Sequence, residues 1–195
     1  MKNKNISANI TQISKLNNAD LSRELINENY NPIVIPNGTD LKYYSFSPEG
    51  RKTIRGRFDI HQEDILVGTI GRLELEKGID VLINAFKSLL FLDNIKLFII
   101  GNGSLREEYF NLIKKYRATD RVILLGAMDN IPEWLSALDI YVQPSRGEGF
   151  GLALLEAMAV GLPVIASNVG GIIPLLNNGQ AGILVPPESP DELAK

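Results

Sequence analysis

The sequence contains no cysteine and a single histidine, His61, among its 195 residues. The missing thiols exclude disulfides and thiolate metal sites, although they leave the cellular compartment open. His61 lies in a polar connection, residues 59–63, where we expect no catalytic role. No cluster of Asp and His residues has the spacing of metal ligands, so the sequence gives no reason to expect a metal centre.

Neither sign of charge dominates the chain. Its 20 Lys and Arg residues and 23 Asp and Glu residues give a net charge of −3, so nothing indicates nucleic acid as a partner. The one basic run is residues 51–57. Contact with anionic lipid is one interpretation of this run, but we favour a solvated helix face.

Apolar stretches suited to a membrane are also missing. The first ten residues have no hydrophobic region of the signal-peptide type. Residues 149–166 are nearly all apolar, but Glu156, Gly161 and Pro163 interrupt them, which favours a buried helix followed by a buried strand. We expect a cytoplasmic protein and leave peripheral contact with a membrane open.

That same region is the most informative part of the chain. Residues 139–142 form an apolar run short enough for a buried strand, and a turn with repeated glycines follows at 144–151. Residues 152–160 are good helix formers, closed by a glycine and followed by a strand at 163–167. Strand, glycine-rich turn, helix and strand form the unit of a parallel sheet, in which ligands bind at the carboxyl ends of the strands.

Two carboxylates flank this turn, Glu148 in the loop and Glu156 in the helix. Glycine lets the backbone approach a ligand closely, and the first amides of a helix favour an anion such as a diphosphate. A carboxylate would repel a phosphate, but it accepts hydrogen bonds from the vicinal hydroxyls of sugars and riboses. The pattern therefore indicates a phosphate flanked by sugars. The alternative is that Glu148 only complements the helix dipole and that Glu156 lies on a solvated face.

Strands and helices alternate along the rest of the chain. We expect further strands at 65–70, 96–100, 121–125 and 182–185, helices at 48–57, 79–90, 105–116 and 131–137, and a last helix from 191. This alternation predicts an α/β fold, a three-layer Rossmann-like sandwich around a parallel sheet of about five strands.

Two cations lie where such a sheet would bind a ligand. Arg72 follows the strand at 65–70 and Lys77 precedes the next helix, so both side chains can reach the same crevice. Arg offers a planar fork to phosphate oxygens, and Lys adds a compact charge. Taken alone, this pair is more simply explained as surface charge.

The chain divides near residue 32. Residues 1–31 are polar and rich in asparagine, with a helix expected at 19–29, and we expect them to be a linker or the incomplete tail of an N-terminal domain. A short strand at 32–36 opens the second unit. We expect residues 32–195 to form one Rossmann-like domain, in which the last helix, from 191, stops with the sequence.

Three blocks of sequence carry a family resemblance. E-G-F-G-L-A-L-L-E, from Glu148 to Glu156, followed by A-M-A-V-G-L-P-V-I-A-S, is similar to the E-x(7)-E motif of retaining family-four glycosyltransferases. G-R-L-x(3)-K-G, which contains Arg72 and Lys77, resembles the diphosphate clamp of this family. V-I-P-N-G-T-D resembles its entry into the nucleotide-binding domain.

The resemblance implies the second domain of an enzyme with GT-B architecture, in which two Rossmann-like domains face each other across a cleft. It implies transfer of a sugar from a nucleotide-diphosphate sugar to an acceptor such as a polysaccharide or lipid-linked glycan, with the anomeric configuration retained. The nucleotide sugar is the donor substrate, and neither a cofactor nor a bound metal is required. A separate acceptor-binding domain or chain is a further expected partner.

The same resemblance assigns roles to particular residues. Arg72, Lys77 and Glu148 are the expected catalytic residues: the cations neutralise the leaving diphosphate, and Glu148 holds hydroxyls of the transferred sugar. Glu156 binds the ribose hydroxyls in this assignment, and Met128 lies near the base. The other expected contacts with the substrate come from the glycine-rich turn and the start of the helix, at Gly149, Phe150, Gly151, Leu152 and Ala153.

The chain departs from the family pattern in three respects. The acceptor-binding domain is essentially absent, Pro174 stands where the family often has an acid, and the chain stops before the helices that cross back to the first domain. The alternative function is therefore a donor-binding half-domain that needs a partner chain, or a truncated remnant. A nicotinamide-dependent oxidoreductase is disfavoured, because Arg106 replaces the third glycine of a dinucleotide fingerprint begun by Gly101 and Gly103.

Overall fold

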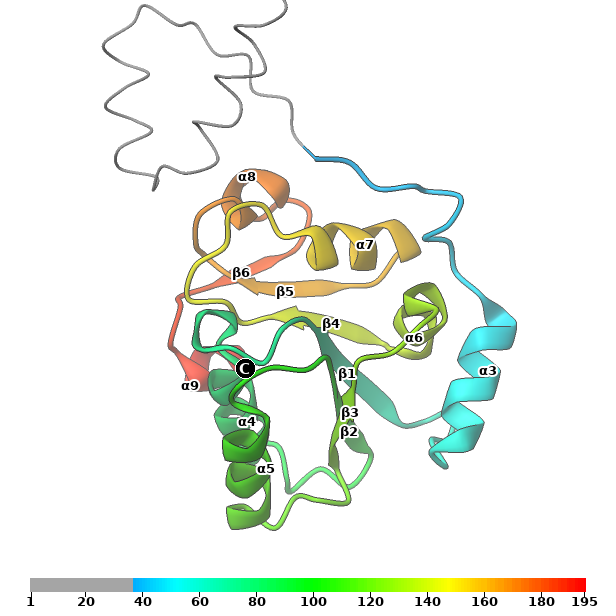
Figure 1. Ribbon diagram of the computed structural model, residues 1–195, viewed down its shortest axis with the longest axis vertical. Helices are drawn as coiled ribbons and strands as arrows, with labels where there is room; N and C mark the ends of the chain where they lie inside the picture. Colours follow the sequence, from blue (N-terminus) through cyan, green and yellow to red (C-terminus); the bar gives the residue numbers. More distant parts are fainter. Residues whose placement is uncertain (1–36) are drawn as a thin grey trace, which may run out of the picture. The chain divides into compact units, whose positions relative to one another are not determined.

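The computed structural model describes residues 37–195, an alternating series of strands and helices (Figure 1). The strand expected at 32–36, the helix expected at 19–29 and the linker expected at 1–31 lie outside the described residues. The strands are β1 (Ile65–Ile70), β2 (Ile95–Ile100), β3 (Val122–Gly126), β4 (Ile140–Gln143), β5 (Val164–Ser167) and β6 (Ile183–Val185). The helices are α3 (Pro48–Arg57), α4 (Ile79–Lys87), α5 (Arg106–Lys115), α6 (Ile131–Ala137), α7 (Leu152–Val160), and the single turns α8 (Ile172–Leu175) and α9 (Pro190–Leu193).

The six strands form one parallel sheet in the order β3-β2-β1-β4-β5-β6. The direction of strand order reverses between the neighbours β1 and β4, where Val67 pairs with Ile140. In a sheet of this kind, ligands bind at the carboxyl ends of the strands on either side of that reversal. The predicted α/β sandwich with a parallel sheet is confirmed, with six strands rather than about five.

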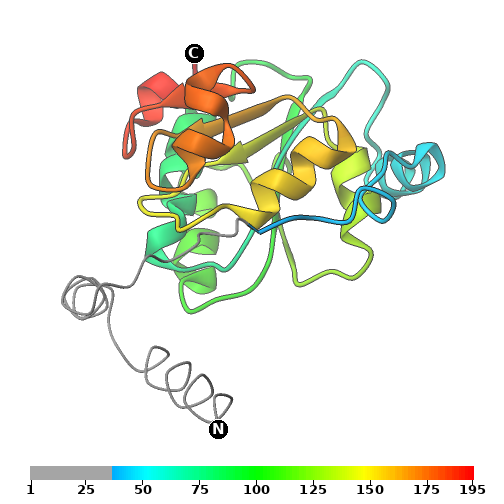
Figure 2. The same cartoon turned by 90° about the horizontal axis from the view of Figure 1, so that it is seen from above.

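Helices cover both faces of the sheet. Figure 1 shows α4 and α5 on one side and α3 and α6 on the other, and Figure 2 shows α6 beside α7. Successive strand residues point to opposite faces: Leu66 and Phe98 pack in the core next to α3, α6 and α7, whereas Val67 and Leu97 pack next to α4 and α5. Because both faces are buried, the strands are continuous apolar runs.

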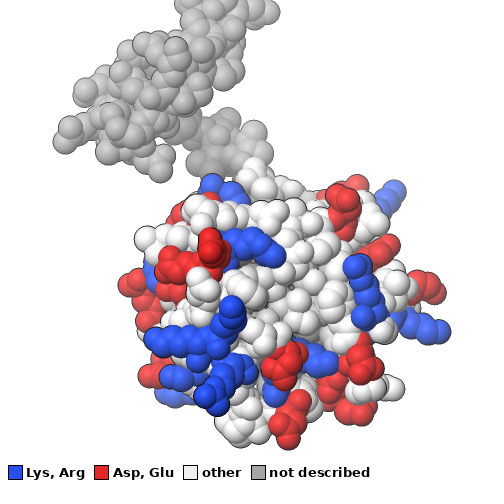
Figure 3. Space-filling model, turned by 60° about the horizontal axis from the view of Figure 1, so that its bottom comes forward, with Lys and Arg blue, Asp and Glu red and all other residues white. Residues whose placement is uncertain are grey.

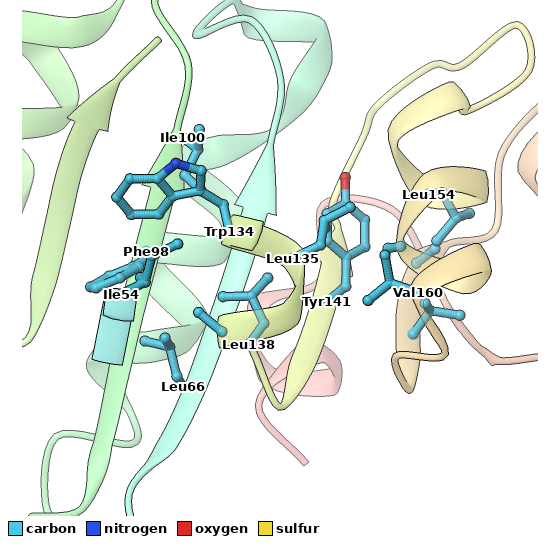
Figure 4. Close-up of a cluster of buried hydrophobic side chains, with 14 of the residues drawn as sticks. Ile54, Leu66, Phe98, Ile100, Trp134, Leu135, Leu138, Tyr141, Leu154 and Val160 are labelled. Atoms are coloured by element: carbon cyan, nitrogen blue, oxygen red, sulfur yellow. The ribbon is translucent and has the colours of Figure 1, made fainter. Parts of the chain in front are cut away.

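Tyr141 is a polar exception within this core. Figure 4 shows its ring between Leu135 of α6 and the side chains of Leu154 and Val160 on α7. The side chain is fully buried, and its hydroxyl lies near the carbonyl oxygen of Ile70 at the end of β1. The phenol therefore brings a buried hydroxyl to the carboxyl ends of the central strands.

The start of α3 follows from its sequence. The side chain of Ser47 accepts a hydrogen bond from the amide of Gly50 at 3.0 Å, and Pro48 occupies the first helical position, as predicted. Gly50 also marks the contact with α6, because a Cβ there would lie 2.8 Å from the Cβ of Glu133. The glycine that weakens the helix intrinsically is thus required by its packing.

Two of the four basic side chains in the run on α3 are directed inward. Arg51 and Arg55 bind the carboxylate of Asp139 at 2.6 and 2.9 Å and also donate to carbonyl oxygens at the end of α6. Burial alone would raise the pKa of Asp139, but the amide of Leu66 and the two arginines lower it. The predicted solvated face is therefore wrong for these two arginines. Of the four basic residues in this run, Lys52 and Arg57 are exposed.

Sequence and structure differ mainly at the ends of elements. The apolar spacing predicts a helix to residue 90, but α4 ends at Lys87, and Leu89 and Leu90 pack on the core from the turn that follows. The turn α8 is not predicted, because no side chain caps its start at Gly171.

Within the described part of the chain, no helix is both long enough and apolar enough to cross a membrane. The face shown in Figure 3 carries side chains of both charge signs around a broad uncharged area. This mixture agrees with the net charge of the sequence, which is close to zero.

Candidate functional site

A cleft of about 540 Å³ lies at the carboxyl ends of β1 and β4, where the strand order reverses. Its walls come from the loops after these two strands, the end of the short segment that leads into α4, and the first turn of α7. The lining residues are Asn37, Ile70, Gly71, Arg72, Lys77, Gln143, Glu148, Phe150, Gly151, Leu152 and Ala153. Most of the site residues predicted from the sequence are thus brought together in one cleft.

The other predicted residues lie outside this cleft. Met128 lines an adjoining, more apolar cleft of about 310 Å³, which shares Arg72 and the end of β1 with the first. Gly149 belongs to the same loop as Glu148 but does not line the cleft. Glu156 does not line it either. Burial and the neighbouring carboxylate of Glu156 raise the pKa of Tyr44 to about 12, which places this carboxylate beside the phenol.

The centre of the cleft is an ion pair between Lys77 and Glu148. Lys77 Nζ lies 2.6 Å from Glu148 Oε2, and the two side chains are only 19% and 14% exposed. Gly78, with φ 63°, makes this approach possible, because a Cβ there would overlap the carbonyl oxygen of Pro144. The loop after β4 and the start of α4 are therefore in direct backbone contact.

Arg72 is held far less firmly. Its guanidinium lies 2.8 Å from Glu76 four residues later, and its side chain is 71% exposed. An exposed pair of this kind contributes at most about 1 kcal/mol to stability. Arg72 can therefore exchange Glu76 for a ligand in the cleft.

A buried polar chain extends from the core to Glu148. The Tyr141 hydroxyl lies 2.6 Å from Gln143 Oε1, and Gln143 Nε2 donates to Ser145 Oγ at 2.9 Å and to Glu148 Oε2 at 3.3 Å. Gln143 is not among the residues predicted from the sequence. A polar residue that ends the apolar run before Pro144 is the signal that could have identified it.

The loops around the cleft touch backbone to backbone. A Cβ at Gly170 or Gly171 would overlap the carbonyl oxygen of Glu148 or Gly149, and the Gly171 amide donates to Glu148 O at 2.9 Å. In the same way, a Cβ at Gly101 would overlap Gly71 O, the carbonyl oxygen next to Arg72. The glycines therefore allow the loops that carry the charged residues to pack together.

Arg146 ties the glycine-rich loop to α4. Its guanidinium binds both carboxylate oxygens of Asp80, at 2.7 and 2.8 Å, and donates to Glu188 and to Leu75 O at 2.8 Å. The hydrogen bonds from Arg146 hold the pKa of Asp80 below its usual value. This link could not be predicted from the sequence, because its partners are far apart in the chain.

The start of α7 completes the cleft. Gly151 precedes it in a left-handed conformation, φ 93°, and no side chain caps the helix. Its first amides therefore point out unpaired at the end of the helix where the dipole favours an anion. Cations and helix amides suit phosphate oxygens, and the carboxylate suits hydroxyls. No group of three or more His, Asp or Glu side chains suited to a metal ion occurs among residues 37–195.

Comparisons with known proteins identify the family of the chain. Residues 50–195 match the family described as glycosyl transferases group 1. An uncharacterized glycosyltransferase of Methanocaldococcus jannaschii is 34% identical over 152 residues, which cover 77% of this chain and 39% of that protein. N-acetyl-alpha-D-glucosaminyl L-malate synthase of Bacillus anthracis is 31% identical over 170 residues, which cover 84% of this chain and 44% of that protein.

Solved structures share the fold. Anabaena HepE in complex with UDP and glucose aligns with a TM-score of 0.77 and 30% identity, over 83% of this chain and 45% of that chain. The C-terminal domain of LpcC, a glycosyl transferase group 1 family protein from Francisella tularensis, aligns with a TM-score of 0.69 and 28% identity, over 80% of this chain and 84% of that domain. This chain spans less than half of the length of the curated relatives it matches.

Proposed function

The chain belongs to the group 1 glycosyltransferases and has the fold of their C-terminal GT-B domain, and on that premise we propose that its cleft binds a nucleotide-diphosphate sugar. In a complete enzyme, the sugar then passes to an acceptor such as a polysaccharide or lipid-linked glycan, with its anomeric configuration retained. One observation carries this proposal: Lys77 and Glu148 meet at 2.6 Å in a cleft that also contains the uncapped start of α7.

We assign the diphosphate to the cationic side of the cleft. Lys77, Arg72 and the first amides of α7 all border the same space and offer donors to phosphate oxygens. As the bond between the sugar and the phosphate breaks, negative charge grows on the leaving diphosphate. Lys77 and Arg72 stabilise this charge more strongly than they stabilise the bound substrate, which lowers the barrier.

We assign the transferred sugar to Glu148. In the structure this carboxylate is paired with Lys77. When Lys77 turns to the diphosphate, Glu148 becomes available to the sugar hydroxyls. The ion pair thus holds both side chains beside the space that the donor would occupy.

The base and the ribose belong to the other side of Arg72 in this proposal. The adjoining apolar cleft that contains Met128 takes the base. Glu156 takes the ribose hydroxyls, and for this its carboxylate must turn from Tyr44 toward the cleft. UDP and glucose are bound by the related HepE, which supports a donor of this class.

A second candidate function is donor binding without transfer by these 195 residues alone. The length of the match favours this candidate, since these residues correspond to less than half of the length of the curated relatives. Transfer needs an acceptor held opposite the donor, and the cleft described here contains only the donor-binding side.

Calorimetric titration of the chain with UDP, GDP, UDP-glucose and GDP-mannose tests the shared part of both candidates. We expect at least one nucleotide to bind, and binding to weaken in Lys77→Ala and in Glu156→Ala. Lack of binding by every probe would contradict the proposal. An assay for hydrolysis or transfer then separates the candidates: turnover by the chain alone favours the enzyme, and binding without turnover favours the half-domain.

A further inference from the structure

Gln143 is a buried amide that reaches the cleft. It is the last residue of β4, its side chain is only 3% exposed, and it lines the cleft together with Glu148. Its Nε2 donates to Ser145 Oγ and to Glu148 Oε2, and its Oε1 lies 2.6 Å from the Tyr141 hydroxyl. Both ends of the amide are therefore in use.

The direction of the amide follows from Tyr141. Burial raises the pKa of this phenol, so the hydroxyl keeps its proton and can donate it. The amide oxygen of Gln143 is the nearer acceptor, since Ile70 O lies at 3.3 Å. With its oxygen toward Tyr141, Gln143 turns its NH₂ group toward Glu148. The opposite orientation would place two acceptors against each other.

The two oxygens of Glu148 differ in their surroundings. Oε2 accepts hydrogen bonds from Lys77 at 2.6 Å and from Gln143 at 3.3 Å. Oε1 has no hydrogen-bond partner within residues 37–195. If Lys77 moves to the diphosphate, as proposed above, Gln143 is the side-chain donor that remains on Oε2.

We propose that Gln143 is a positioning residue that anchors Oε2 of Glu148 while the donor is bound, so that Oε1 is presented to the transferred sugar. This inference rests on the proposed function and sharpens it. An ionised carboxylate oxygen is an acceptor only, so the sugar must offer it a hydroxyl or an amide N–H. A carboxylate or phosphate on the sugar at this position would be repelled.

Gln143→Leu tests the proposal, because leucine keeps the side-chain bulk and removes the amide. We expect the affinity for UDP-glucose to fall about tenfold, the range for a lost hydrogen bond to a charged group. The affinity for UDP should stay within about twofold, since UDP carries no sugar for Glu148 to hold. Gln62→Leu, at an exposed glutamine outside the cleft, is the matched control and should change neither affinity.

Exchanging the amide and the carboxylate between positions 143 and 148 tests whether Gln143 acts through its hydrogen bond to Glu148 or through packing. Gln143→Glu places two carboxylates side by side and should weaken UDP-glucose binding more than Gln143→Leu does. Adding Glu148→Gln restores one carboxylate and one amide in exchanged positions. If the two side chains act through their hydrogen bond, the double variant binds UDP-glucose better than Gln143→Glu alone, although less well than the wild type.

The outcomes are distinguishable. Unfolding midpoints and UDP affinity show whether each variant is folded. Equal loss of UDP and UDP-glucose affinity in Gln143→Leu, no loss of either, or no recovery in the double variant would overturn the role of Gln143 and leave the proposed function intact. Equal affinity of the wild type for UDP and UDP-glucose would overturn it as well. If the wild type binds no nucleotide, the proposed function fails, and this inference fails with it.

Discussion

Each end of the sheet carries a carboxylate paired with basic side chains, but the two carboxylates differ in how many hydrogen bonds the protein supplies to them. At the amino end, Asp139 accepts hydrogen bonds from Arg51, Arg55 and the amide of Leu66. Arg55 also donates to three backbone carbonyls, those of Ala137, His61 and Asp64, and is 6% exposed. At the carboxyl end, Glu148 accepts on only one oxygen among the described residues.

This difference separates a structural role from a binding role. A buried charge needs several partners, and where the protein supplies them all, the group stabilises the fold and has nothing to offer a ligand. Where a charged group faces a cleft with acceptor or donor capacity unused, that capacity is open to water or to a ligand. The pair of Lys77 and Glu148 is of this second kind.

The largest loss of stability should come from removing a partner of Asp139 at the amino end of the sheet. Arg55→Met leaves part of the Asp139 carboxylate and several carbonyls without a donor, and it should lower the free energy of unfolding by about 3 kcal/mol. Urea unfolding measures this. Lys52→Met, at an exposed position on the same helix, should change it by less than about 0.5 kcal/mol. Similar values for the two variants would contradict the structural role of Arg55.

A second variant tests the backbone contacts at the carboxyl end. In Gly171→Ala, the new Cβ overlaps Gly149 O, so the loops must separate, and we expect a loss of about 2 kcal/mol. Nothing lies within 4 Å of a Cβ at Gly147, so Gly147→Ala in the neighbouring loop should be near neutral. Urea unfolding of both variants gives the comparison. A neutral Gly171→Ala would show that the loops are not tightly joined.

The pair of Lys77 and Glu148 should affect nucleotide affinity more than it affects the free energy of unfolding. Lys77→Ala should lower the affinity for UDP at least tenfold, because a charge-assisted contact with phosphate is lost, and should lower turnover of a complete enzyme about a hundredfold. Because both side chains line the cleft, water can replace Lys77 beside Glu148, so the free energy of unfolding should fall by less than the value of about 3 kcal/mol expected for Arg55→Met. Calorimetry and urea unfolding measure the two quantities. Lys115→Ala, exposed on α5, is the control, and unchanged UDP affinity in Lys77→Ala would remove Lys77 from the site.

The smallest effect concerns Asp80 and its pair with Arg146. The pKa of Asp80 is lowered in the folded state, so its contribution to stability is complete above about pH 4 and is lost as the pH falls through the lowered pKa. Asp80→Asn should therefore lower the free energy of unfolding by about 1 kcal/mol at pH 7 and by less at pH 3. Urea unfolding at several pH values checks this. A difference that does not change with pH would exclude the ion pair as its cause.

Much of the fold is determined locally and could be predicted. The bounds of β1, α6 and α7 agree with the apolar patterns and with helix signals such as the glycine after α7. The direction of the Arg51 and Arg55 side chains could not be predicted, because it depends on Asp139, which lies more than 80 residues away. Periodicity identifies a basic helix, but it does not reveal a distant carboxylate.

The candidate site shows the same division. Motifs located Arg72, Lys77 and Glu148, which line one cleft. Gln143 was missed although its partners Tyr141 and Glu148 are close in the chain, because the sequence does not show that its amide joins them. Arg146 was missed because its partners Asp80 and Glu188 lie 66 and 42 residues away, and such contacts leave no spacing pattern in the sequence. The roles assigned to the catalytic and binding residues stay predictions until ligand binding is measured.

The strand order has a consequence for folding kinetics. The partners β1 and β4 are distant in the chain: Leu66 and Asp139, joined by a hydrogen bond, are 73 residues apart. The pairs β1–β2 and β2–β3 join strands that are closer together in the chain. Because closing a longer loop costs more entropy, we expect the β1–β4 pair to form later than these two pairs. The cleft lies at the carboxyl ends of β1 and β4, so we expect it to form late in folding. A bound nucleotide should then slow unfolding without accelerating refolding.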